Sequence, residues 1–426
     1  MPRFNLGLFQ KRFGGNHKIT GTSVNMGSTK GRGSATRMFN QHANNSERIH
    51  KFISVRSIPS PPPVNYYWST LGSGTNSDST TSFAVAIDST NNVYVGGYFS
   101  TAGGISTNAI AKWNPNTSTW STLTSGINYY INSIAIDSNN NVYAGGRFTF
   151  AGGISAKCIA KWNPNTSTWS ALGSGIRNLD FSASDVNSIA IDSADNVYVG
   201  GSFTSAGGVS VSCVAKWNPN TNTWSPLGTG AKGIVNAIAI DSADNVYIGG
   251  LFTSAGDIEV NNVAKWNPHT NTWSALSSGI NNNVRALAID SNDNVYVGGS
   301  FTSAGDAYAS CVAKWNSNTS TWSPLGSGLN QSKTENIVVT SIAIDLANNV
   351  YIGGIFHMVN NIVVNNVAKW NPNTSTWSEL DGGTNYSKDY NIGVAAIGID
   401  SNNVYIAGGF TTAGTISANY VAKWGV

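Results

Sequence analysis

Acidic and basic side chains recur along this chain at nearly constant spacing, so the first question is what chemistry they could perform. An Asp ends an apolar segment in each copy of a repeat, and a Lys stands in an A-K-W segment of each copy. The two sets are Asp88, Asp137, Asp192, Asp241, Asp290, Asp345 and Asp400, and Lys112, Lys161, Lys216, Lys265, Lys314, Lys369 and Lys423. Matched carboxylates and ammonium groups could serve acid–base chemistry, or they could pair and cap turns. Because both recur in every copy, we interpret them as structural.

Other side chains that support catalysis or metal binding are sparse. The repeat region contains two histidines, His269 and His357, in different kinds of connection. Arg147, Arg177 and Arg285 would suit a sialidase, but the S-x-D-x-G-x-x-W box is missing. The D-S-x-D-N segments lack the length and the Gly of a calcium loop. We therefore predict that the chain has no catalytic residue, no cofactor and no metal site, and that it is not an enzyme.

The elements that position these residues follow from a repeat of 49 to 55 residues. Each copy carries four strand signals, A-I-A-I-D, N-V-Y-V-G-G, V-A-K-W-N and T-W-S-x-L. Asp-Ser-x-x-Asn forms the turn between the first two strands, because Asp and Asn side chains bond their own backbone there. Asn-Pro-Asn-Thr forms the turn between the third and fourth strands. A non-helical repeat of this length indicates an all-β β-propeller with four antiparallel strands per blade.

Pairs of tryptophans and the broken ends of the repeat refine this prediction. Trp113 and Trp120, seven residues apart, are expected to face each other across a hairpin and to pack between blades, with a sugar-stacking platform as the alternative.

The first copy opens with only a fourth strand, residues 67–71, and the last copy stops after a third strand, residues 421–424. We predict that these strands pair, with Trp68 facing Trp424, and close a seven-bladed propeller.

Two motifs resemble those of known repeat families. The Gly-Gly-x-Phe of the second strand and N-T-x-T-W-S-x-L resemble kelch repeats of galactose-oxidase-type propellers. The string G-G-x-F-T-x-A-G-G with V-A-K-W is similar to kelch-like propellers of fungal cortical proteins, bacterial surface proteins and giant-virus repeat proteins. The resemblance covers residues 65–426 and implies the fold, but it does not fix an activity. A copper site like that of galactose oxidase would need His, Tyr and Cys residues that this sequence does not supply from one face.

The connections from the fourth strand to the next first strand vary in length, and variable loops commonly carry function. The long connections 327–338, 382–393 and 73–82 belong to blades that we expect to be consecutive. They mix carboxylates, lysines and aromatic rings, which suits a peptide or glycan surface; solvated insertions are the alternative. The candidate partner-binding face consists of Asp78, Lys333, Glu335, Asp381, Tyr386, Lys388, Asp389 and Tyr390.

The residues before the repeats form a second region of different charge. Residues 1–58 hold ten basic residues and one acid, a net +9, so the rest of this +3 chain carries −6. We predict an extended, basic N-terminal arm over residues 1–64 that ends in a Pro-rich spacer, and a propeller over 65–426. The candidate anchoring residues are Arg3, Lys11, Arg12, Lys18, Lys30, Arg32, Arg37, Arg48, Lys51 and Arg56.

These features predict a structural or interaction propeller that the arm anchors in a large assembly of proteins. A minor capsid or virion component of a giant virus is the expected setting, from resemblance. A carbohydrate-binding adhesin is one alternative, and a scaffold that binds nucleic acid through the arm is the other.

The expected compartment follows from the cysteines and the apolar runs. Cys158, Cys213 and Cys311 occupy one repeat position in three blades, too far apart for disulfides, which favours free thiols and a reducing compartment. No conventional signal peptide or membrane span is expected, so we predict location in a virion or the host cytoplasm.

Overall fold

Strands build all of the regular structure in this protein. The computed structural model describes residues 65–76, 83–179, 184–329, 337–385 and 393–426. These residues form strands and short connections but no helix, so the described part offers no helical segment that could cross a membrane. The predicted all-β class is confirmed for this part of the chain.

Four antiparallel strands in series make up each large sheet, and the described residues contain seven such sheets, numbered here from the N-terminus. Sheet 1 comprises β2 (Phe83–Ile87), β3 (Val93–Gly97), β6 (Ile110–Asn114) and β7 (Thr119–Thr122); sheet 2 comprises β8 (Ile131–Ile136), β9 (Val142–Gly146), β12 (Ile159–Asn163) and β13 (Thr168–Ala171); sheet 3 comprises β15 (Asp185–Ile191), β16 (Val197–Ser202), β19 (Val214–Asn218) and β20 (Thr223–Pro226).

The remaining sheets follow the same order. Sheet 4 comprises β21 (Ala231–Ile240), β22 (Val246–Ala255), β24 (Val263–Asn267) and β25 (Thr272–Ala275); sheet 5 comprises β26 (Val284–Ile289), β27 (Val295–Gly299), β30 (Val312–Asn316) and β31 (Thr321–Pro324); sheet 6 comprises β32 (Val338–Ile344), β33 (Val350–Ile355), β36 (Val367–Asn371) and β37 (Thr376–Ser378); sheet 7 comprises β38 (Val394–Ile399), β39 (Val404–Gly408), β42 (Val421–Gly425) and β1 (Tyr67–Thr70).

A short hairpin between the second and third strands was not predicted. It forms at T-x-A-G-G and at variants of this segment such as S-T-A-G-G, where Gly103 and Gly104 adopt φ of 58° and 80°. Glycine takes this left-handed backbone without strain, so the chain can reverse here. The strands are β4 (Thr101–Ala102) with β5 (Ile105–Ser106), β10 (Phe150–Ala151) with β11 (Ile154–Ser155), β17 (Ser205–Ala206) with β18 (Val209–Ser210) and β14 (Ile176–Arg177), β22 with β23 (Ile258–Glu259), β28 (Ser303–Ala304) with β29 (Ala307–Tyr308), β34 (Met358–Val359) with β35 (Ile362–Val363), and β40 (Thr412–Ala413) with β41 (Ile416–Ser417).

Close contacts, one between sheets and one within a sheet, explain the Gly-Gly at the end of the second strand. A Cβ atom on Gly145 would lie 2.5 Å from Val186 Cγ1 in the next sheet, and one on Gly146 would lie 2.2 Å from the Tyr130 carbonyl oxygen. Only glycine leaves room for both approaches. The core therefore lies between neighbouring sheets, where Tyr143 of sheet 2 packs with Ile189 of sheet 3.

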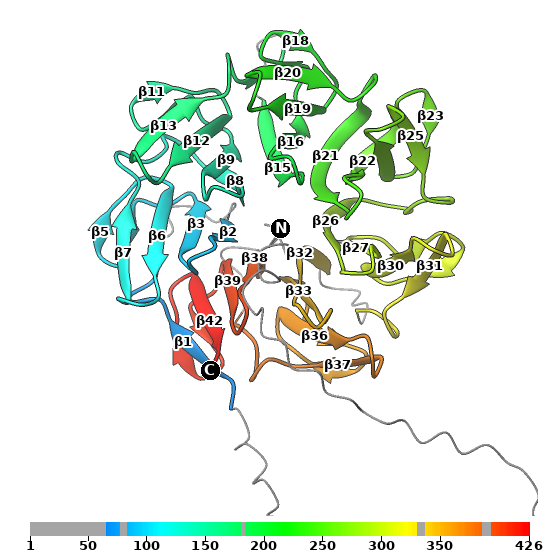
Figure 1. The fold of residues 1–426 in the computed structure, drawn as a ribbon. Helices are drawn as coiled ribbons and strands as arrows, with labels where there is room; N and C mark the ends of the chain where they lie inside the picture. The colour runs from blue at the N-terminus through cyan, green and yellow to red at the C-terminus, as the bar shows by residue number, and fades with distance from the viewer. Residues whose placement is uncertain (1–64, 77–82, 180–183, 330–336, 386–392) are drawn as a thin grey trace, which may run out of the picture. The chain divides into compact units, whose positions relative to one another are not determined.

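The first strands of the sheets contact one another in a cyclic order. β2 contacts β8, and the series continues through β15, β21, β26, β32 and β38, which contacts β2 again. β1 pairs antiparallel with β42, so that Trp68 lies opposite Trp424, and the two ends of the repeat region lie side by side (Figure 1). Sheet 7 is thus assembled from both ends of the repeats.

Tryptophans in the fourth strands tie each sheet to its neighbour. Each indole N–H donates a hydrogen bond of 2.8 to 3.1 Å to the backbone carbonyl of a Leu that follows or ends the fourth strand of the adjacent sheet. The pairs are Trp120 with Leu71, Trp169 with Leu123, Trp224 with Leu172, Trp273 with Leu227, Trp322 with Leu276, Trp377 with Leu325, and Trp68 with Leu380. Six Trp pairs also face each other within their hairpins at centroid distances of 5.2 to 5.5 Å. The predicted role of these rings in packing between blades is confirmed.

A second set of links joins the turns between first and second strands. The Ser193 N–H and hydroxyl donate to the two carboxylate oxygens of Asp244 in the next sheet, at 3.1 and 2.6 Å. Equivalent links join Ser89 with Asn140, Ser138 with Asp195, Ser242 with Asp293, and Ser291 with Asn348. Leu346 stands at the Ser position of sheet 6 and is 79% exposed. Sheet 6 therefore has no side-chain hydroxyl at this position to donate to sheet 7.

Substitution of the facing Trp68 and Trp424 tests the indole link. Trp68 Nε1 donates to Leu380 O, whereas Trp424 Nε1 is buried without a hydrogen-bond partner among the described residues. Trp68→Phe should therefore lower the free energy of unfolding by about 0.5–1.5 kcal/mol more than Trp424→Phe. Urea midpoints at unchanged m-value measure the difference, and equal losses would contradict the inferred role of the hydrogen bond.

Candidate functional site

The structure describes few of the residues that the sequence put forward as sites. Asp381 is exposed and follows β37 in a left-handed turn, with φ of 44°. Seven other members of the predicted face lie outside the described residues: Asp78, Lys333, Glu335, Tyr386, Lys388, Asp389 and Tyr390. All ten anchoring residues of the arm also lie outside them. These assignments remain predictions.

The repeated Asp residues are the centres of buried hydrogen-bond networks. Asp192 Oδ1 accepts the N–H groups of Ala194 and Asn196, at 3.0 and 2.8 Å. Asn196 Nδ2 donates to both carboxylate oxygens, at 3.1 and 2.8 Å, and the Tyr198 hydroxyl donates to Oδ2 at 3.2 Å. The carboxylate therefore fixes the turn and ties it to the second strand.

The repeated Lys residues complete this network. Lys216 Nζ lies 3.9 Å from Asp192 Oδ2 and 5.3 Å from the centroid of the Tyr198 ring. Similar ion pairs join Lys161 with Asp137, Lys265 with Asp241, and Lys314 with Asp290. The predicted pairing and capping are confirmed at these positions. Burial, and next the charge of Asp192, raise the pKa of the Tyr198 hydroxyl far above its usual value, so this group stays a donor.

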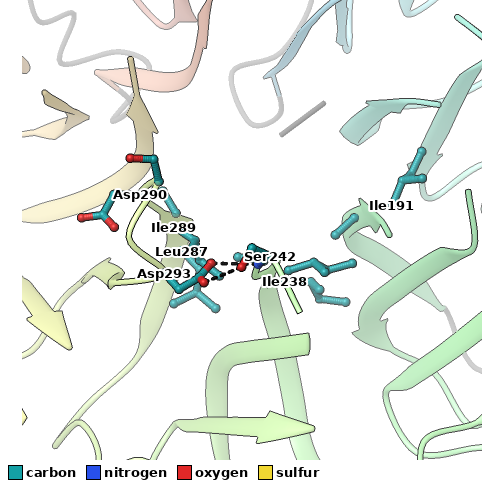
Figure 2. Close-up of a pocket in the computed structure, with 12 residues that line it drawn as sticks. Ile191, Ile238, Ser242, Leu287, Ile289, Asp290 and Asp293 are labelled. Carbon is teal, nitrogen blue, oxygen red and sulfur yellow. Dashed lines mark hydrogen bonds between the residues drawn. The ribbon is translucent and has the colours of Figure 1, made fainter. Parts of the chain in front are cut away.

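An apolar cavity of about 280 Å³ lies between the first strands of sheets 3, 4 and 5 (Figure 2). Its wall includes Ile191, Ile238 and Ile289, and its polar rim includes Asp290 and Asp293. Asp290 belongs to the Asp–Asn–Tyr–Lys network of sheet 5, and Asp293 accepts the Ser242 N–H at 2.8 Å. Because the carboxylates already serve internal contacts, the cavity offers an apolar surface rather than a catalytic group.

The histidines and cysteines occupy separate places. His269 lies between β24 and β25, and His357, which lies between β33 and β34, has its Nδ1 2.7 Å from Asn365 Oδ1. Within the described ranges, no cluster of three His, Cys, Asp or Glu residues could hold a metal ion. Cys158, Cys213 and Cys311 form no disulfide, as predicted, and burial raises the pKa of the Cys158 and Cys213 thiols.

One group of polar and aromatic residues departs from the repeat at the edge where second strands end and first strands begin. We call Tyr98, Tyr129, Tyr130, Arg147 and Asp185 the tyrosine cluster. Tyr98 follows β3, the two adjacent tyrosines precede β8, Arg147 follows β9, and Asp185 begins β15. Sheets 1, 2 and 3 thus each contribute to it.

The geometry of the tyrosine cluster holds one ring at the surface. Tyr129 is 42% exposed, and its ring centroid lies 4.7 Å from that of Tyr130 and 5.5 Å from that of Tyr98, which it meets edge-on. The Tyr130 hydroxyl donates to Asp185 Oδ1 at 3.3 Å. Such packing on two sides restricts the rotamers of Tyr129 and preorganises its exposed face.

Charge in the tyrosine cluster is balanced. Arg147 is exposed; a hydrogen bond to Tyr130 and the negative charge of Asp185 raise the pKa of its guanidinium. Burial is the main cause of the raised pKa of the Tyr130 hydroxyl, which therefore remains a donor to the carboxylate. The cluster combines an aromatic surface, a guanidinium and a carboxylate within one contact network.

Sequence reasoning considered Arg147 alone among these residues, and only as part of a sialidase set. Arg177 lies in β14 and Arg285 in β26, and neither belongs to the tyrosine cluster. The available signal was Tyr129-Tyr130 at the repeat position where sheet 5 has Asn282-Asn283. Only the folded structure shows that Asp185, from the next sheet, lies beside Tyr130.

Comparisons with known proteins identify the fold more firmly than an activity. The model of a family described as the Rax2 C-terminal beta propeller domain matches residues 69–178, 176–294 and 275–409. The chain is also similar in structure to the extracellular domain of a putative one-component system from B. thetaiotaomicron, with a TM-score of 0.52 and 13% identity over 85% of this chain and 42% of that chain. The chain therefore spans less than half the length of that protein, and the likeness shows the fold alone. No curated protein sequence matches.

Substitution of a buried Asp tests whether the repeated carboxylates are structural. Asp192→Asn should lower the free energy of unfolding by about 2–4 kcal/mol, because it removes the ion pair with Lys216 and brings two amide groups together. Asp195→Asn is the matched control, since Asn140 and Asn348 already make the same link between sheets. Chemical unfolding measures both, and a stable Asp192→Asn variant would contradict the structural role.

The buried tyrosines predict a loss of stability in alkaline solution. Burial and the neighbouring Asp raise the pKa of Tyr94, Tyr143, Tyr198, Tyr247, Tyr296, Tyr351 and Tyr405. A raised folded-state pKa stabilises the protein fully below the unfolded pKa of about 10, and this stabilisation declines as pH rises above it. These tyrosines should therefore ionise together with unfolding, in a step measured by ultraviolet absorbance and circular dichroism. Ionisation of all sixteen tyrosines near pH 10 in a chain that keeps its native circular dichroism would refute this expectation.

Proposed function

The chain belongs to the family of Rax2 C-terminal β-propeller domains, and from this premise we propose that it is a non-catalytic interaction module. The observation that carries the proposal is the use of the repeated charges. Asp137, Asp192, Asp241 and Asp290 each pair with a Lys and accept an Asn and a Tyr hydrogen bond within one sheet. Groups held in this way build a scaffold. We therefore expect the binding residues at positions that depart from the repeat, such as the tyrosine cluster.

The proposed scaffold is a seven-bladed ring that is closed by the pairing of β1 with β42. Three observations support it: the cyclic order of contacts between first strands, the Trp–Leu hydrogen bonds that join Trp68 to Leu380 and Trp120 to Leu71, and the register that places Trp68 opposite Trp424. Closure of this kind supplies the last sheet with its fourth strand, and a closed propeller leaves only short, protected sheet edges.

Residues 1–64 are proposed to anchor the propeller in a larger assembly of proteins. The support is the charge difference, +9 over residues 1–58 against −6 over the rest of the chain. The family match supports neither a kelch-like nor a giant-virus relationship, and the proposal therefore names no virus particle.

Removal of residues 1–64 tests the anchoring proposal. The shortened chain should keep the circular dichroism and the thermal midpoint of the propeller, and it should no longer co-sediment with the assembly from the source cells. Co-sedimentation equal to that of the full chain would reject anchoring by the arm. Release of the full chain by nuclease would instead assign the arm to nucleic acid, whose binding weakens steeply with salt.

A further inference from the structure

We propose that the tyrosine cluster binds a neutral saccharide, with the exposed face of Tyr129 as the stacking surface and Asp185 and Arg147 as the groups that bond sugar hydroxyls. This inference rests on the proposed function, because it names the ligand class of the surface that an interaction module would use. It does not depend on the arm or on the assembly.

The stacking surface is the first argument. Tyr129 is 42% exposed, while Tyr98 and Tyr130 are half-buried and hold its ring at 5.5 and 4.7 Å. A sugar ring presents a face of C–H groups that an aromatic ring can cover, and Tyr loses little conformational entropy when it does so. The fixed ring therefore suits a flat ligand of about the size of one sugar residue.

The polar groups beside this surface are the second argument. The Asp185 carboxylate has acceptor capacity beyond the single Tyr130 hydrogen bond, and the Arg147 guanidinium is an exposed donor. Adjacent sugar hydroxyls both donate and accept hydrogen bonds. One carboxylate and one guanidinium, both in contact with the Tyr130 hydroxyl, can supply an acceptor and a donor to such a pair.

The opposite charges of the tyrosine cluster favour a neutral sugar over an acidic ligand. Arg147 and Asp185 carry opposite charges, and the pKa of Arg147 is raised by Tyr130 and Asp185, its own neighbours in the cluster. An anion would gain attraction from the guanidinium but meet repulsion from the carboxylate. A neutral polyol can use both groups, and its binding should depend little on salt.

The extent of the surface argues against a flat protein partner as the primary ligand. A stable protein interface buries about 800 Å² on each side around a desolvated apolar core. In the described part of this edge, the tyrosine cluster exposes one large ring, with its two aromatic neighbours partly covered. A small ligand matches this geometry better.

A glycan microarray provides the direct test. The full chain is applied to immobilised neutral oligosaccharides of glucose, mannose, galactose and N-acetylglucosamine, together with sialylated and sulfated glycans and acidic peptides. We expect binding to a neutral class that is retained in high salt. Tyr129→Ala and Asp185→Asn should each weaken it at least tenfold, and Tyr129→Phe, which keeps the stacking face, should restore most of it.

Matched controls use the same fold. Tyr308→Ala removes a tyrosine that is 64% exposed in β29, in the hairpin between β27 and β30, and Asn282→Ala changes the position equivalent to Tyr129; both variants should bind as the unsubstituted chain does. Unchanged circular dichroism identifies variants that remain folded. The inference would be overturned if no neutral saccharide binds, or if the Tyr129→Ala variant binds as tightly as the unsubstituted chain. Salt-sensitive binding of acidic peptides alone would also overturn it, while keeping the interaction role.

Discussion

The Asp that follows each first strand, buried in sheets 1 to 5, is the constraint on which the rest of this structure depends. Its carboxylate fixes the following turn, accepts the Tyr hydroxyl of the second strand, and lies near the Lys of the third. One charged group thereby sets the relative positions of three strands. Removal of such a group from water is costly unless its hydrogen-bonding capacity is filled, so the Asn, Tyr and Lys partners recur with it.

The same turn also relates one sheet to the next. The Ser after the Asp bonds to a left-handed Asp or Asn of the adjacent sheet, and the fourth-strand Trp bonds to a Leu carbonyl of its neighbour. Stability is therefore distributed over repeated junctions, each of which depends on local geometry. Departures from the repeat can then carry binding without loss of the fold, as we propose for the tyrosine cluster of sheets 1 to 3.

Sequence predicted the parts of this structure that are local or periodic. The strand segments, the Asp–Asn turns, the facing Trp pairs and the Asp–Lys contacts follow from spacing within one repeat, and the β-propeller class follows from their recurrence. The short hairpins at T-x-A-G-G were missed because four strand signals already satisfied the pattern. The tyrosine cluster was missed because Tyr130 and Asp185 belong to different sheets and meet only through packing between them. Seven of the eight residues of the predicted face lie outside the described residues, so that face remains a prediction.

Amide hydrogen exchange in the turns measures the central claim most directly. The N–H groups of Ala194 and Asn196 donate to the buried Asp192 carboxylate although Ala194 is exposed at the surface. If the carboxylate fixes the turn, both amides exchange slowly, and the equivalent amides of the other sheets behave alike. Exchange at the rate of an unstructured peptide would show that these turns are not held by the Asp residues, and the structural role of the repeated charges would fail.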